Sequence, residues 1–151
     1  SYAERLNKIS SLVVSEAATG DRLRSGTALI APGGHHLLVR RDRDGLFAAL
    51  LPRQSADKYV PSADMMMTSV AEVCGSATLG VVLTGMGNDG AAGATAIKRQ
   101  RGQCLAESEE SAVIFGMPQE AIRAGGVDKV LPLVKMADEI IHRCNAKITN
   151  A

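Results

Sequence analysis

The residues with the clearest capacity for chemistry lie in one glycine-rich segment, LTGMGNDGAAG at residues 83–93. The apolar run 79–84 predicts a buried β-strand, and the sequence that follows the segment predicts a helix. Parallel sheets carry binding and catalytic groups at the carboxyl ends of their strands, and the N–H groups that open a helix can bind an anion or an oxyanion. The segment is therefore a candidate active-site turn, although Asn88 or Asp89 could instead simply cap the helix.

The same segment also matches a dinucleotide-binding pattern. Gly85, Gly87 and Gly90 have the spacing G-x-G-x-x-G between a predicted strand and a predicted helix. Glu107 ends the next predicted strand, where an acidic residue would bind the ribose. The carboxylate of Asp89 opposes this interpretation, since it would repel a pyrophosphate in the first helical turn. A dinucleotide site stays open as an alternative.

The remaining histidines, methionines and cysteines do not form a site by their spacing. His35 and His36 are adjacent, so in an extended segment they point to opposite faces and cannot bind one metal together. We interpret them as turn residues or hydrogen-bonding groups, and methionines 65–67 as core residues of a helix. The cysteines lack the spacing of a metal or redox pair and are interpreted as buried, reduced thiols: Cys74, Cys104 and Cys144.

The elements that must position these residues follow from hydrophobic periodicity and turn signals. With 151 residues, 46% of them hydrophobic, the chain fits one domain with one core. The patterns predict a helix from the chain start to about Ser10, strands 11–16, 27–31, 37–40 and 46–51, helix 63–74 capped by Ser62, strand 79–84, helix 88–101, strand 103–107, helix 117–125, strand 129–131 and helix 133–144. Asp44-Gly45 predicts a hairpin. This order indicates a three-layer α/β/α domain, doubly wound, with a mainly parallel sheet and an antiparallel hairpin insertion.

Composition excludes several classes of partner. The formal net charge of +1 gives no field that would attract nucleic acid or an anionic membrane. The apolar runs are far shorter than a membrane span requires, so no membrane insertion is expected. The N-terminus has no secretory signal pattern, which favours a cytoplasmic location. The chain begins with Ser1 rather than Met, and we expect that something has been removed upstream.

Several segments, taken together, resemble the catalytic domain of the chemotaxis protein-glutamate methylesterase (CheB) family. They occur in the same order along essentially the whole chain: AERLN at 3–7, IAPG at 30–33 with His36, PSAD at 61–64, LTGMGNDGAAG at 83–93 and FGMP at 115–118. The resemblance implies a parallel α/β domain that hydrolyses methyl esters of glutamate residues on chemoreceptors. It also implies a receiver domain upstream in the intact protein.

The resemblance assigns roles to residues of the glycine-rich turn. In the family a serine nucleophile, a histidine base and an aspartate form a triad, and the family aspartate falls on Asp89. Its implied role is to orient the imidazole and stabilise the imidazolium during attack. The backbone N–H of Met86 resembles the family's oxyanion donor. No metal or cofactor is implied.

The triad's serine and histidine lie, in the family, upstream of the AERLN segment. We therefore expect residues 1–151 to be the C-terminal portion of a single catalytic domain, without its N-terminal strands and inactive alone. No G-x-S-x-G turn occurs in the sequence, and neither Ser62 nor the histidines His35 and His36 are expected to substitute. An exposed sheet edge would favour self-association or a bound N-terminal fragment. A non-catalytic association module of the same fold is the alternative.

Overall fold

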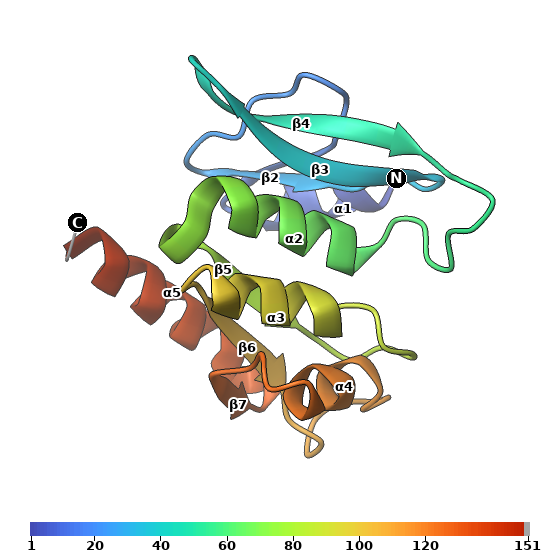
Figure 1. Cartoon of the computed structure of the whole chain (residues 1–151). Coiled ribbons are helices and arrows are strands. Elements are labelled where there is room, and N and C mark those ends of the chain that lie inside the picture. The colour runs from blue at the N-terminus through green and yellow to red at the C-terminus, as the bar shows by residue number, and fades with distance from the viewer. Residues whose placement is uncertain (150–151) are drawn as a thin grey trace.

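The computed structural model describes residues 1–149, so the last two residues of the expected domain lie outside the description. The elements, coloured along the chain in Figure 1, are α1 (Tyr2–Ile9), β1 (Val13–Glu16), β2 (Thr27–Ile30), β3 (His35–Asp42), β4 (Gly45–Pro52), α2 (Ala63–Cys74), the 3-10 turn η1 (Gly75–Ala77), β5 (Leu79–Val82), α3 (Ala91–Arg99), β6 (Gln103–Glu107), α4 (Met117–Arg123), β7 (Lys129–Leu131) and α5 (Leu133–Thr149). Every predicted helix and strand is present. The largest differences are in two helices: α3 begins three residues later than predicted, and α5 continues past residue 144.

Local sequence signals explain several element ends. At the start of α1, the Ser1 hydroxyl accepts a hydrogen bond from the Glu4 backbone N–H, while the Glu4 carboxylate accepts one from the terminal amine at 2.8 Å. Ser62 caps α2 as predicted, because its hydroxyl oxygen accepts from the Met65 backbone N–H at 3.3 Å. The β3–β4 hairpin turns where predicted, with Gly45 at φ +117°.

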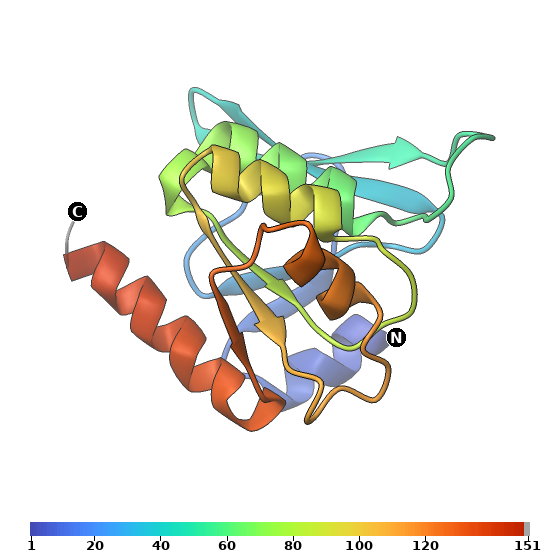
Figure 2. The ribbon, with the colours of Figure 1, turned by 60° about the horizontal axis from the view of Figure 1, so that its bottom comes forward.

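The fold class is confirmed: parallel strands alternate with helices, and an antiparallel hairpin interrupts them. Strands β5, β6 and β7 form a parallel sheet in that order, with α2 and α3 on one face and α5 on the other (Figures 1 and 2). The parallel strands are divided, however, because β1 and β2 pair only with each other and the hairpin β3–β4 forms a third sheet. The β5 edge is therefore unpaired within residues 1–149.

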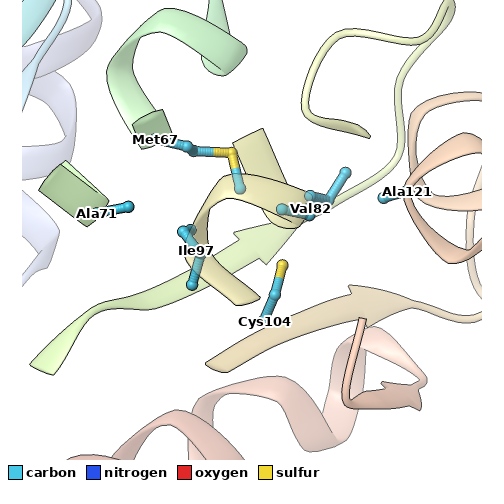
Figure 3. Close-up of a cluster of buried hydrophobic side chains, with 7 residues drawn as sticks. Met67, Ala71, Val82, Ile97, Cys104 and Ala121 are labelled. Carbon is cyan, nitrogen blue, oxygen red and sulfur yellow. The ribbon is translucent and has the colours of Figure 1, made fainter. Parts of the chain in front are cut away.

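The main core lies between β5, β6 and the helices that cover their first face. Figure 3 shows this cluster, in which Ile97 of α3 lies between Ala71 of α2 and Val82 of β5, with Met67 of α2 on one side and Cys104 of β6 on the other. Met67 is buried, as expected for the methionine run, since an unbranched side chain fills irregular space well. Because α2 also packs on β3, this helix is fixed from both sides (Figure 1).

Two groups of residues differ from their predicted environments. The adjacent histidines lie in strand β3 rather than in a turn, and only His36 is buried. Among the cysteines, Cys104 is buried, Cys74 is half-buried and Cys144 is exposed, so the prediction of three buried thiols is wrong. Burial, aided by the charge of Asp128, raises the pKa of the Cys104 thiol to about 12. No helix among residues 1–149 is long and apolar enough to cross a membrane.

Candidate functional site

The structure places Asp89 in the loop that follows β5, just before α3. Its side chain is 7% exposed. It does not cap α3, because the capping residue of that helix is Gly90, without any side-chain cap. The interpretation of Asp89 as the cap of the following helix is therefore wrong.

Asp89 instead binds the start of α2, the helix beside α3. Its Oδ1 accepts hydrogen bonds from the Ser62 hydroxyl at 3.0 Å and from the Asp64 backbone N–H at 2.9 Å. Its Oδ2 accepts one from the Ala63 backbone N–H at 2.7 Å. Three donors and the positive end of the α2 dipole thus fix this carboxylate in one orientation. An ionised carboxylate has about four acceptor positions, so one position on Oδ2 has no donor among the described residues.

Asp64 makes the reciprocal contact. Its Oδ1 accepts hydrogen bonds from the backbone N–H groups of Gly90 and Gly93, both at 2.8 Å. The N-termini of α2 and α3 are therefore each bound by an acidic side chain from the start of the other helix. Asp89, just before α3, binds the N-terminus of α2, and Asp64, in the first turn of α2, binds the N-terminus of α3. Sequence reasoning assigned Asp64 no role, although an acidic residue in the first turn after Ser62 is a signal for such a contact.

Gly93 allows these two helix starts to approach closely. A Cβ at this position would lie 2.7 Å from the Cβ of Met67 and 3.3 Å from the Cα of Asp64. Only glycine fits here without displacing α2, because such distances are shorter than van der Waals contact.

The Met86 backbone lies on the outer side of the same loop. The Met86 side chain is 75% exposed, and no group within residues 1–149 accepts a hydrogen bond from its backbone N–H. The preceding residue is clamped, because Gly85 donates to the Ile114 carbonyl at 3.0 Å and accepts from the Met117 N–H at 2.8 Å. A Cβ on Gly116 would meet the Gly85 carbonyl oxygen at 2.7 Å. The loop thus presents an unpaired N–H from a fixed backbone, which is what an oxyanion donor requires.

The structure does not support the dinucleotide alternative. A pyrophosphate would bind at the N-terminus of α3, but the Gly90 and Gly93 N–H groups there already donate to the Asp64 carboxylate. Glu107, the expected ribose ligand, is 1% exposed. Its two oxygens accept hydrogen bonds from the Thr84 backbone N–H at 2.9 Å and the Ser111 hydroxyl at 2.8 Å. Glu107 therefore holds the glycine-rich loop from behind instead of facing a ligand.

Ser62 and His36 lie close together but do not form a nucleophile and base pair. The Nδ1 of His36 accepts a hydrogen bond from the Ser62 backbone N–H at 3.2 Å, whereas the Ser62 hydroxyl donates to Asp89. The hydroxyl proton is thus directed to a carboxylate, and the imidazole nitrogen nearest Ser62 is already used. General-base activation needs the serine hydroxyl to face the imidazole, so this arrangement does not provide it. No group of three or more His, Cys, Asp or Glu among the described residues could hold a metal ion.

Comparison with known proteins gives matches over nearly the whole chain. A family model described as CheB methylesterase matches residues 1–140. The chain is 55% identical over 143 residues to "Protein-glutamate methylesterase/protein-glutamine glutaminase 3" of Geobacter sulfurreducens, covering 95% of this chain and 38% of that protein. A protein-glutamate methylesterase/protein-glutamine glutaminase of Chromobacterium violaceum is 47% identical over 137 residues, covering 91% of this chain and 38% of that protein.

The chain also has a fold similar to that of a solved catalytic domain. The catalytic domain of Thermotoga maritima CheB methylesterase superposes with a TM-score of 0.88 at 37% sequence identity, covering 93% of this chain and 74% of that one. The chain thus spans less than half the length of the curated relatives but most of a solved catalytic domain. Since the family model covers all but the last eleven of the 151 residues, the chain belongs to the CheB methylesterase family.

Proposed function

We propose that this chain forms the part of a protein-glutamate methylesterase domain that supplies the triad carboxylate and an oxyanion donor. The observation that carries the proposal is Asp89, held in one orientation at the carboxyl end of a parallel strand with acceptor capacity left on Oδ2. The unpaired Met86 N–H lies three residues before it in the same loop. The substrates would be methylated glutamate residues of chemoreceptors. A cytoplasmic location and an upstream receiver domain belong to the same proposal and rest on family membership alone.

In the proposed reaction, a serine and a histidine from outside these residues complete the triad. The serine oxygen attacks the ester carbonyl carbon while the histidine takes the serine proton, and Asp89 accepts the other imidazole N–H. The carbonyl oxygen becomes an oxyanion that the Met86 N–H stabilises. Collapse expels the methoxy group, which takes the proton back and leaves as methanol. Water then cleaves the acyl-serine by the same proton transfers and releases the glutamate.

The test uses a chimaera in which the amino-terminal part of the Geobacter sulfurreducens relative's catalytic domain precedes residue 1. Methanol release from methylated chemoreceptor is expected from the chimaera and not from residues 1–151 alone. The Asp89→Ala change should lower kcat by about 10⁴-fold, the scale for a triad aspartate. Its exposed neighbour provides the control, Asn88→Ala, with kcat near that of the parent. Equal activity of the two variants would refute the assignment, and so would serine-dependent turnover by the isolated chain.

The relatives' names also include protein-glutamine glutaminase, which suggests a second activity. Hydrolysis of a glutamine amide needs the same attack and the same oxyanion donor, but the leaving group is ammonia instead of methanol. The chimaera, given receptor with glutamine at the modified positions, should therefore release ammonia. Asp89→Ala should abolish both activities together. Ammonia release that survives this change would place the second activity at another site.

The unpaired edge of β5 is the proposed contact for the rest of the domain. A cavity of about 190 Å³ lies along it, lined mainly by apolar groups, among them Met66 of α2, Val81 of β5 and Leu83, which follows β5. The chain covers 74% of the solved Thermotoga maritima domain, which leaves about a quarter of that domain unmatched. We take the occupant to be a strand from the amino-terminal part of such a domain, because a strand satisfies both the free backbone groups and the apolar wall.

Light scattering tests this contact. The isolated chain is expected to associate with itself, and the separately produced amino-terminal part of the Geobacter sulfurreducens domain should convert it to a one-to-one complex. Self-associated chains that ignore the added segment would favour a second copy as the occupant and contradict the strand proposal. A chain that stays monomeric with and without the segment would also contradict it.

A further inference from the structure

His36 is a buried side chain that the proposed reaction does not use. It lies in β3, on the far side of α2 from the core around β5, and is 2% exposed. A buried imidazole needs a hydrogen-bond partner for each nitrogen, and both partners are present. Nε2 lies 2.9 Å from Oδ2 of Asp57, and Nδ1 accepts from the Ser62 backbone N–H at 3.2 Å.

These contacts fix the imidazole in one tautomer. Since Nδ1 accepts from a backbone N–H, the ring proton lies on Nε2 and is donated to Asp57. Asp57 is itself anchored, because its Oδ2 also accepts from the Gln54 backbone N–H at 2.8 Å. The Gln54 N–H and, secondly, His36 hold the pKa of the Asp57 carboxyl below its usual value. The ring therefore joins the loop after β4 to the first residue before α2.

The backbone held by His36 is also the backbone that binds Asp89. The Ser62 N–H points to the imidazole, while the Ser62 hydroxyl and the next two N–H groups, of Ala63 and Asp64, point to the Asp89 carboxylate. Loss of the imidazole would release the Ser62 N–H into a buried space. The backbone before α2 would then shift until the Ser62 N–H reached another acceptor. The three groups that donate to Asp89 would shift with it.

We propose that His36, oriented by Asp57, is a positioning residue for Asp89. It holds the start of α2 in the one place from which three donors converge on the carboxylate, and it acts through Ser62 without touching substrate. The catalytic consequence rests on the proposed function of Asp89, whereas the structural coupling does not. The two can therefore fail separately.

The first experiment measures amide hydrogen exchange by NMR in the 151-residue chain. His36→Leu should exchange the Ala63 and Asp64 amides at least about tenfold faster, the factor that corresponds to one ordinary hydrogen bond. The Leu105 amide, in the β6 ladder, should keep its parent rate. The adjacent exposed histidine supplies the matched control, His35→Leu. This change should leave the exchange rates of the Ala63, Asp64 and Leu105 amides at their parent values.

Two conservative variants separate positioning from simple core filling. His36→Asn keeps an acceptor near the Nδ1 position and should restore slow exchange at Ala63 and Asp64. His36→Gln keeps a polar group near the Nε2 position, loses the acceptor for Ser62 and should stay fast. If His36→Leu does not fold, this pair decides alone. Equal exchange in the two variants, or acceleration of Leu105 by the same factor, would overturn the proposal.

The second experiment carries the same variants into the chimaera. His36→Leu is expected to lower kcat about tenfold with little change in KM, and His36→Asn to recover most of it, because substrate binding does not involve this ring. If Asp89→Ala leaves methanol release intact, the proposed function fails while the exchange result still stands. If Asp89→Ala abolishes release and His36→Leu behaves as the parent, the positioning proposal fails alone.

Discussion

Replacing Asp89 by alanine in the isolated chain tests the geometry of the site without any catalysis. The carboxylate binds three groups at the start of α2, and one of its oxygens is bonded at 2.7 Å. Alanine removes the acceptor but leaves the donors of Ala63 and Asp64 in place. If Asp89 were only a poised catalytic group, its removal would cost little or even stabilise the fold.

The expected loss follows from the bonds that are broken. A hydrogen bond to a charged group contributes about 1.5–3 kcal/mol, and an acidic side chain at a helix N-terminus contributes about 0.3–1 kcal/mol more. Three bonds that share one acceptor are not additive, and water can reach donors at a helix start, so we expect about 3–4 kcal/mol for Asp89→Ala. At about 2–4 °C per kcal/mol, the Tm should fall by roughly 10 °C. Asp89→Asn keeps one acceptor oxygen and should lose about half as much free energy.

The assay is urea denaturation followed by circular dichroism at pH 7. Asn88→Ala is the control, since the side chain of this exposed neighbour makes, among the described residues, only a 3.5 Å hydrogen bond from the Tyr59 hydroxyl. The change should alter the free energy of unfolding by less than about 0.5 kcal/mol. An Asp89→Ala loss no larger than that of the control would refute the role of this carboxylate at α2. A large loss with an unchanged slope against urea would support it.

Three further predictions use the same chain. Gly93→Ala should lower the free energy of unfolding by about 1–3 kcal/mol, because the new Cβ would lie 2.7 Å from a side-chain carbon of α2; an unchanged urea midpoint would contradict the close approach. The exposed Cys144 should react with dithiobisnitrobenzoate at pH 8 while native Cys104, whose pKa is raised to about 12, does not, and rapid reaction of both would show that Cys104 is not enclosed. The lowered pKa of Asp57 stabilises the fold above pH about 4, and this contribution is lost as the pH falls through the folded-state pKa. Urea midpoints of Asp57→Asn and the parent should therefore differ at pH 6, and the difference should shrink as the pH falls below about 4. A difference that does not change with pH would contradict the lowered pKa of Asp57.

The order of elements could be predicted because each one is specified by signals within a few residues. Apolar runs of four to six residues predicted the strands, Ser62 marked the start of α2, and Asp44-Gly45 marked the hairpin. Asp89 could be singled out because it follows a buried strand and precedes a helix. These signals are local, so they do not depend on how the elements pack.

The contacts of the site could not be predicted in the same way. Asp64 and Asp89 are 25 residues apart. Each carboxylate binds the N-terminus of the other's helix only because the two helices start side by side, which is a property of packing. His36 reaches Ser62 across 26 residues for the same reason. The division of the parallel strands into two sheets was also missed, since periodicity identifies strands but not their partners.

The sequence posed capping of the following helix and catalysis as alternative roles for Asp89. In the structure the carboxylate binds the start of a different helix, α2, and this structural role is compatible with catalysis. An oriented carboxylate is useful in a triad only if it does not have to be ordered again at each turnover, and a freely rotating side chain would lose conformational entropy whenever it met an imidazole. Binding to α2 removes that freedom during folding, while Oδ2 keeps an acceptor position for the imidazole N–H. Binding to α2 is therefore the physical basis of the catalytic role proposed for Asp89. For this reason, variants that keep Asp89 but loosen the start of α2 should also lower kcat.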